Sequence, residues 1–296
     1  MRTNDQQDLA ALDAAKRYMG DFAWPTVLLG LGTALAYLIT PLLVVTGALP
    51  ILAGLALMSV LTYMAYTALH DAVHGSVSGS HKQLRWLNEL VGYLSAWVLM
   101  IPLTAHRHEH LAHHRNTNQE DDPDKVVADM AKSPLHAARA AIRVTVGQYR
   151  YYLANRWGKG PRSQDVYFCL EILLALAPRL AFLAAGFWVE GLLLFVLSGV
   201  FGIALLMYLF AYVVHTPHAA VGRYVDTSTF IVPGKLGTLV TVLWGYQNYH
   251  SIHHLFPRVP FYRYADLFAE IEDIMIAKGA PIHRLYTGGK IGVVNH

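Results

Sequence analysis

Four apolar runs in this sequence are long enough to cross a membrane as helices. They cover residues 24–46, 51–69, 167–188 and 191–214. A membrane-spanning helix takes about 20 apolar residues, and it satisfies all its backbone polar groups internally, as lipid requires. Only 15% of the residues are charged, whereas soluble domains average about 25%. We therefore predict an all-α integral membrane protein with four transmembrane helices.

The positive charges predict the orientation of these helices. Lysines and arginines are frequent in the polar segment 105–166 and absent from the turns at 47–50 and 189–190. Because positively charged loops stay in the cytoplasm, we expect this segment and both termini on the cytoplasmic side of the inner membrane. Residues 86–103 contain a continuous apolar part of only about 14 residues, which favours an interfacial or re-entrant segment that Pro102 breaks. Residues 236–246 are also too short to span.

The two ends of the sequence are predicted to form amphipathic helices attached to a single domain of residues 1–296. Residues 1–23 are expected to form a helix on the membrane surface with Leu9 and Leu12 on its inner side, and no cleavable signal peptide is expected. Residues 264–296 are expected to form a helix and a tail. The apolar stripe of that helix consists of Leu267, Phe268, Ile271, Ile274 and Met275. The net charge is only +3 and no basic patch is visible, so a nucleic-acid partner is not expected.

Histidines recur in three clusters with the spacing of metal ligands on a helix. The spacing i, i+3, i+4 occurs twice and the spacing i, i+4 once, and these spacings put side chains on one helical face. Another histidine, His215, follows the fourth apolar run. With four spans, all of these positions arrive at the cytoplasmic face together. The nine candidate ligands are His70, His74, His110, His113, His114, His215, His250, His253 and His254.

Nine imidazoles are too many for one ion, which takes four to six ligands, so we expect a helical cytoplasmic cap that carries two metal ions. The single cysteine, Cys169, leaves only nitrogen and oxygen ligands. Imidazole suits zinc, copper, iron and nickel alike. The paired Glu-x-x-His motifs of carboxylate-bridged di-iron bundles are missing, which leaves a nearly all-histidine di-iron site with open positions for O2.

Other polar residues near the clusters are candidates for supporting roles. A carboxylate can fix the tautomer of a metal-binding imidazole, and Asp71, Asp121, Asp122 and Asp124 are placed to do so. His106 and His108 leave the ligand face of their helix, so they are expected to support a ligand or to face solvent. His218, in the sequence HTPH, is an alternative to His215. Asn248 either holds a metal-bound water or forms a turn.

At these residues the chain resembles the membrane fatty acid desaturase superfamily of histidine-box, non-haem di-iron enzymes. The segments HDAVH, HLAHH and HSIHH match its three boxes in order, and the resemblance covers roughly residues 50–270. The segments HLAHHRNTNQEDDPD, VVHTPH and GYQNYHSIHHLFPRVPFYRY are similar to the bacterial and cyanobacterial β-carotene hydroxylases of this type.

The resemblance implies two irons held by the nine histidines, activation of O2, and electrons from a separate protein such as ferredoxin with its reductase. A purified sample can carry zinc in place of iron. In related acyl desaturases an asparagine before the histidine that follows the last span acts through water. Ala211 stands four residues before His215, so the resemblance leaves His218 or Asn248 to take that role.

Three functions were weighed. The first is a monooxygenase that hydroxylates the β-ionone ring of β-carotene to a zeaxanthin-type xanthophyll, with the ring entering from lipid past Trp97, Tyr208 and Trp244. The alternative is an acyl-lipid or acyl-CoA desaturase with the same iron chemistry. A third is a non-catalytic metal transporter. Ionisable residues along the spans would mark an ion pathway, and the spans carry only Glu171 and Arg179.

Overall fold

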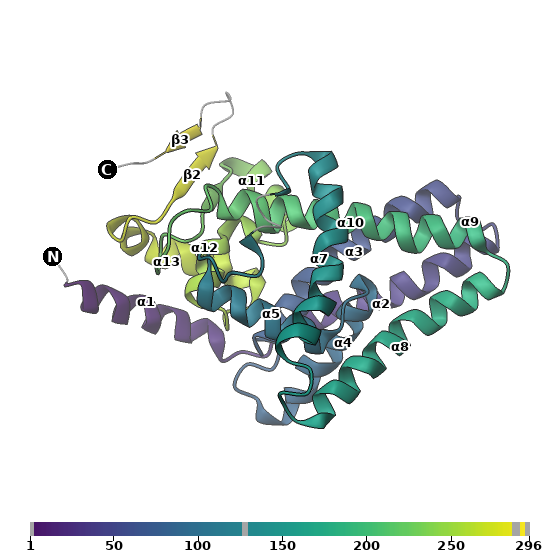
Figure 1. The fold of residues 1–296 in the computed structure, drawn as a ribbon. Coiled ribbons are helices and arrows are strands. Elements are labelled where there is room, and N and C mark those ends of the chain that lie inside the picture. Colours follow the sequence, from purple (N-terminus) through teal and green to yellow (C-terminus); the bar gives the residue numbers. More distant parts are fainter. Residues whose placement is uncertain (1–2, 126–129, 286–290, 294–296) are drawn as a thin grey trace.

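The computed structural model describes residues 3–125, 130–285 and 291–293. Most of this part of the chain is helical, as predicted, and four helical segments are long and apolar enough to cross a membrane. Three lie close to the predicted runs: α2 (Trp24–Val45), α3 (Ile51–Val73) and α8 (Arg162–Ala184). The fourth span, Trp188–Val213, consists of α9 (Trp188–Gly191), α10 (Ser198–Leu206) and the π-helical segments Leu192–Leu197 and Met207–Val213. Figure 1 shows these segments extending together to one side of the molecule.

Two predicted boundaries need correction. Helix α3 continues beyond residue 69 to Val73, so His70 lies within its last turn and His74 caps it. The turn between the third and fourth spans lies at residues 185–187, before Val189 and Glu190, which are helical. Gly186 has a φ of 96°, a conformation that glycine adopts without steric cost. The chain therefore turns there and not three residues later.

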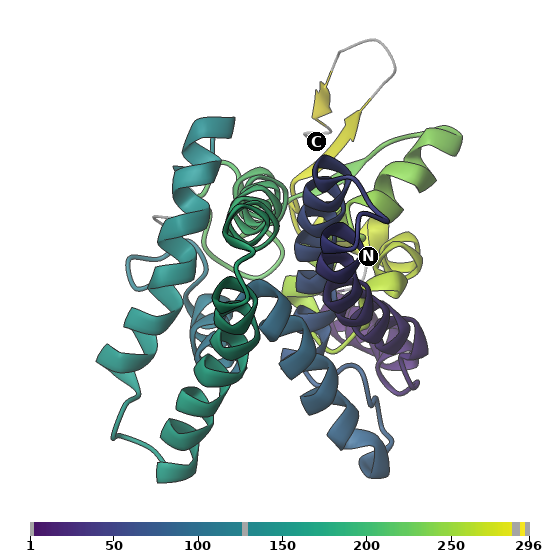
Figure 2. The ribbon, with the colours of Figure 1, turned by 90° about the vertical axis from the view of Figure 1, so that its right-hand side faces the viewer.

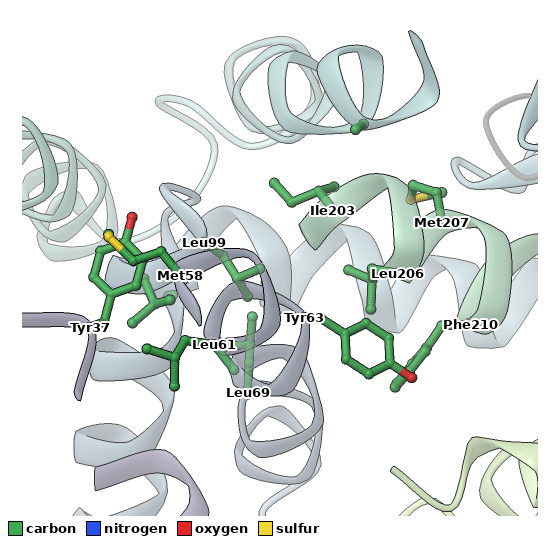
Figure 3. Close-up of a cluster of buried hydrophobic side chains, with 14 of the residues drawn as sticks. Tyr37, Met58, Leu61, Tyr63, Leu69, Leu99, Ile203, Leu206, Met207 and Phe210 are labelled. Carbon is green, nitrogen blue, oxygen red and sulfur yellow. The ribbon is translucent and has the colours of Figure 1, made fainter. Parts of the chain in front are cut away.

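The spans pack closely through small side chains. A methyl group added to Gly202 of α10 would lie 2.5 Å from the carbonyl oxygen of Ser59 in α3, so only glycine allows this helix crossing. Beside it, buried side chains from several helices form one apolar cluster, in which Tyr63 of α3 meets Phe210 edge to face with ring centroids 5.5 Å apart. Figure 3 shows Tyr63, Leu206 and Phe210 of this cluster together.

Residues 86–103 form a bent pair of helices and not a straight span. Helix α4 (Arg85–Leu99) and helix α5 (Leu103–Asn116) meet at 96°. Met100 ends α4 in a left-handed conformation with a φ of 56°, and Pro102 precedes α5. The break predicted at Pro102 is confirmed, and it directs α5 with its three ligand candidates toward the end of α3.

The buried Arg179 of α8 supports this break. Its guanidinium donates to the carbonyl oxygen of Trp97 at 2.9 Å and to the hydroxyl of Tyr37 at 3.3 Å. The same group lies 5.0 to 5.6 Å from the ring centres of Tyr37, Trp97 and Phe195. Among the described residues, the carbonyl oxygen of Trp97 otherwise accepts only a long bond of 3.4 Å from the amide of Met100, so Arg179 completes the hydrogen bonding at the end of α4. This structural role accounts for a charged residue within a span.

The remaining helices gather at the histidine-bearing end of the spans. They are α1 (Asn4–Met19), α7 (Pro134–Asn155), α11 (Gly234–Leu243), α12 (His250–Leu255) and α13 (Tyr264–Ala277). Helix α1 packs on α13. Its buried residues are Ala11, Ala14 and Ala15, and Leu12 packs beside them, whereas Leu9 is 60% exposed. That Leu9 and Leu12 face the membrane surface stays a prediction. Short alanine side chains let the two helices approach closely.

A small sheet was not predicted by the all-α interpretation. Strand β1 (Thr229–Ile231) pairs in parallel with β2 (Ile282–Leu285), and β2 pairs antiparallel with β3 (Ile291–Val293). The register places Thr229 opposite Ile282. Part of the predicted C-terminal tail therefore belongs to a sheet that joins the C-terminus to the loop after the fourth span (Figure 1).

Candidate metal centre

Helices α3, α5 and α12, together with the end of the fourth span, bring the histidines of all three clusters into two groups. The first group contains His70, His74, His110, His114 and His253, and the second contains His113, His215 and His254. Within each group the ligand nitrogens lie within 4.8 Å of one another. Residues up to about 180 positions apart in the sequence thus meet at one end of the spans.

In the first group, imidazole nitrogens face one another at short distances. Nε2 of His110 lies 2.9 Å from Nε2 of His74 and 3.1 Å from Nε2 of His114. Nε2 of His253 lies 2.8 Å from Nε2 of His114. Within the described part of the chain, neither nitrogen of His70 has a hydrogen-bond partner although the residue is buried. Buried imidazole nitrogens that converge without partners fit a shared cation.

The outer nitrogens of several ligand candidates are held by hydrogen-bond acceptors. Nδ1 of His113 is 2.8 Å from a carboxylate oxygen of Asp122, and Nδ1 of His215 is 2.8 Å from the carbonyl oxygen of Ala211. Since both partners only accept, Nδ1 carries the proton and Nε2 is left with a lone pair for a metal. The residues present therefore fit a pair of ions.

His250 lies beside both groups without belonging to either. Its ring centre is 4.8 Å from that of His215 and 6.3 Å from that of His70. Its Nε2 is 3.1 Å from Nε2 of His254, and its Nδ1 is 2.7 Å from Oε1 of Gln247. His250 therefore contacts ligand candidates of both groups and stays a predicted ligand.

Burial favours the neutral, metal-binding form of most of these side chains. His113 is the exception, because burial lowers its pKa but the hydrogen bond to Asp122 and the nearby carboxylates raise it. Burial lowers the pKa of His74 to about 3, and the nearby imidazoles of His254, His106 and His113 act in the same direction. Burial, and to a smaller extent the neighbouring imidazoles, also holds the pKa of His250 and of His253 well below the ordinary value. Neutral imidazoles offer lone pairs to a metal at neutral pH without first losing a proton.

Comparison with known proteins places the chain in a family. The model of the fatty acid desaturase family matches residues 40–286, which is most of the chain. The chain belongs to the fatty acid desaturase family. This membership confirms the superfamily that the three boxes predicted, while the similarity to carotene hydroxylases stays unconfirmed.

Curated relatives of this desaturase-family chain have names from fatty acid metabolism. It is 28% identical over 232 residues to a fatty acid desaturase of Bacillus subtilis, a match that covers 67% of this chain and 61% of that protein. It is 27% identical over 227 residues to an sn-1 oleoyl-lipid 12-desaturase of Picosynechococcus, covering 69% and 63%. A fatty acid conjugase of Calendula officinalis is 23% identical over 251 residues, covering 70% and 63%. The matched region spans about three fifths of the length of each relative.

An apolar cavity of this family member reaches the histidines. Its walls come from α4, α7, α10 and the segment after α10, and they include Leu99, Val144, Ile203, Leu206, Met207 and Phe210. Its lining also includes His110 and His113 of α5, with His215 and His250. The cavity thus connects an apolar lining to both groups of imidazoles.

The three aromatic residues predicted to line a substrate path do not line this cavity. Trp97 contacts Arg179 and donates from its indole to the carbonyl oxygen of Leu174. Trp244 donates to the carbonyl oxygen of Leu209, and Tyr208 is 40% exposed. Trp97 instead lines a second apolar cavity together with Leu94, Ile101 and Leu170. A substrate path past these three aromatic residues therefore stays a prediction.

Two supporting residues have partners other than those predicted. The buried Asp71 accepts hydrogen bonds from the hydroxyl of Thr26 at 2.7 Å and the amide of Phe261 at 3.2 Å, so it joins α2, α3 and the helical turn Phe261–Arg263 that precedes α13. Asn248 donates to the carbonyl oxygen of Phe230 and to the hydroxyl of Thr241. Its role in holding a metal-bound water stays a prediction.

The additional histidines border the groups without joining them. The buried His106 stacks on His110 with ring centres 5.3 Å apart, and its Nδ1 lies 3.2 Å from Oε1 of Gln148. Nε2 of His218 lies 3.0 Å from the carbonyl oxygen of Tyr212. His215 belongs to the second group of converging nitrogens and His218 does not, so the structure favours His215 over His218 as a ligand.

Sequence reasoning missed three residues that hold ligand candidates. Nδ1 of His253 is 3.0 Å from the hydroxyl of Tyr264, Nδ1 of His254 is 3.8 Å from a carboxylate oxygen of Asp226, and Gln247 contacts His250. Gln247 stands three residues before His250, a helical spacing that could have been noticed. Asp226 and Tyr264 are brought to the site only by tertiary folding.

Proposed function

We propose that this protein is a membrane desaturase that introduces a double bond into a fatty acyl chain. The observation that carries the proposal is the apolar cavity that opens onto both groups of imidazoles. The reaction balances when –CH2–CH2–, O2, two electrons and two protons give –CH=CH– and two molecules of water. The electrons would come from a separate protein such as ferredoxin with its reductase.

Each of the two groups of histidines would hold one iron. When bound there, the two irons supply the activation of O2 and the removal of hydrogen from an unactivated C–H bond. Asp122 and the carbonyl oxygen of Ala211 keep the protons of His113 and His215 on Nδ1, so that Nε2 faces the metal. Leu206, Met207 and Phe210 in the cavity wall would position the acyl chain and exclude water.

An acyl chain is a better supported substrate than β-carotene. The three relatives described above carry names that refer to fatty acids or oleoyl lipids. The β-carotene hydroxylase function, which is the first of the three functions predicted from the sequence, has no such support. We therefore propose the alternative, a desaturase. We also propose the inner membrane as its location, with the histidines on the cytoplasmic side, because the lysines and arginines of residues 105–166 favour that orientation.

Product analysis tests this proposal. The full chain is expressed with a ferredoxin and its reductase in a bacterial host that makes β-carotene. Fatty acid methyl esters are analysed by gas chromatography and mass spectrometry, and carotenoids by liquid chromatography. We expect a new acyl double bond and unchanged β-carotene. The variant His253→Ala should abolish the product, and His136→Ala, away from both groups, should preserve it. Hydroxylated carotenoid with unchanged acyl chains would overturn the proposal.

A further inference from the structure

Helix α7 has two different faces. One face is buried, and its Ala137, Ala140 and Ala141 pack inside the protein while Val144 and Gln148 line the cavity. The opposite face carries four exposed apolar side chains, Leu135, Ile142, Val146 and Leu153, which are 62%, 58%, 42% and 53% exposed. At about 100° per residue, these four fall within about 40° of arc. They form a narrow apolar stripe along the outside of the helix.

Three arginines form a second stripe beside the first. Arg139, Arg143 and Arg150 are exposed, and at the same helical repeat they lie about 40° to 80° around the helix from the apolar stripe. The 22 residues of α7 include no aspartate or glutamate. Arg143 contacts the sulfur of Met130, and within the described parts of the chain none of the three arginines has a carboxylate partner. The positive-inside bias explains the number of these arginines, but it does not explain their alignment beside an apolar stripe.

Helix α7 lies across the half of the fourth span that leads to the metal-binding end. In Figure 2, α10 is seen nearly end-on while α7 runs beside it at the edge of the molecule, so α7 crosses the fourth span. It contacts α10 and the following segment Met207–Val213. This segment is the last part of the span, and His215 of the metal-binding end comes soon after it. A helix of this length covers about 33 Å along the membrane plane.

We propose that α7 is an interfacial helix that binds anionic phospholipid headgroups through Arg139, Arg143 and Arg150. The apolar stripe enters the acyl region of the bilayer, and the adjacent arginines contact lipid phosphates, which guanidinium groups bind with two parallel hydrogen bonds. An acidic soluble protein would complement the arginines but would leave the apolar stripe exposed. A lipid surface provides an acyl region for the apolar stripe and phosphates for the arginines. The bound headgroups lie on the opposite side of α7 from the cavity.

Lipid retention tests this proposal without requiring catalysis. The full chain is purified in detergent and mixed with equal amounts of phosphatidylglycerol and phosphatidylcholine, and bound lipids are counted by native mass spectrometry. Wild type should retain phosphatidylglycerol preferentially. Each interfacial arginine contributes about a fivefold preference, so the triple variant Arg139→Gln, Arg143→Gln, Arg150→Gln should reduce it on the order of a hundredfold. The triple lysine variant keeps the charge and should retain most of the preference.

A matched control distinguishes the effect of this surface from the effect of net charge. Lys82, Arg85 and Lys235 are exposed cations outside α7, and changing all three to glutamine removes the same charge but should leave the lipid preference unchanged. The proposal is overturned if wild type shows no preference, or if the glutamine variant on α7 matches wild type. It is also overturned if that variant keeps its lipid but loses binding of reduced ferredoxin. The assay counts bound lipid and not reaction product, so a failure of desaturase activity does not affect its result.

Discussion

Changing Asp122 to asparagine should weaken one metal site and spare the other. One carboxylate oxygen of Asp122 accepts from Nδ1 of His113 at 2.8 Å and from the amide of Asp124 at 2.9 Å, and the other accepts from the amide of Asn118 at 2.9 Å. Burial alone would raise the pKa of Asp122, but the hydrogen bonds from His113 and from the amides of Asp124 and Asn118 lower it, so the carboxylate is ionised at neutral pH. In Asp122→Asn, the new NH2 group faces a donor in either orientation of the amide.

The expected loss is limited to the second group. Removing the residue that orients a metal-binding histidine costs about 10- to 100-fold in metal affinity, which corresponds to about 1.4 to 2.7 kcal/mol. His113 belongs to the group with His215 and His254, whereas the other group has five histidines of its own. Asp122→Asn should therefore release one of two ions at a 10- to 100-fold lower chelator concentration and hold the other normally.

The assay is dialysis of purified protein against graded chelator, followed by metal analysis by inductively coupled plasma mass spectrometry. Asp121 is the exposed neighbour of Asp122, and Asp121→Asn is the matched control, which should behave as wild type. Circular dichroism confirms that the variants are folded. Loss of both ions together in Asp122→Asn, or a release curve identical to wild type, would refute the proposed role of Asp122.

Three further expectations concern the fold and its stability. Gly202→Ala should lower the melting temperature because its methyl group would meet Ser59, whereas Gly199→Ala in the same helix meets nothing within 4 Å and should not lower it. Arg179→Leu should cost about 1 to 3 kcal/mol, measured by thermal unfolding, because buried carbonyl oxygens lose their donor. Metal-free protein should lose stability as the pH falls below about 6.5, by up to about 1.4 kcal/mol per pH unit for each deeply buried histidine. The unfolded chain takes up protons there while burial keeps His250 and His253 neutral, so stability independent of pH between 7 and 5 would contradict this assignment.

The parts of the fold that depend on local sequence were predicted well. The lengths of the apolar runs and the break at Pro102 follow from hydropathy and backbone chemistry, so the spans were found to within a few residues. The histidine spacing is also local, and His110, His113 and His114 indeed share the face of α5 that meets the other clusters. That all of them act as ligands, and that the chain is a single domain, stay predictions.

The features that were missed depend on distant contacts. The pairing of Thr229 with Ile282 joins two short segments that carry no strong alternation, so the sheet could not be seen. The left-handed conformation of Met100 is held by the packing around it, since a residue with a Cβ rarely adopts it. The contacts of Asp226 and Tyr264 with His254 and His253 likewise exist only in the folded chain.

The central claim is that two groups of histidines hold two metal ions. The most direct measurement is the number of metal ions per chain in protein purified from cells supplied with iron, determined together with the same number for His253→Ala and His215→Ala. The account predicts two ions in wild type, iron or a zinc substitute, and the loss of a different ion in each variant. A single ion in wild type, or no metal at all after loading with ferrous iron, would contradict it.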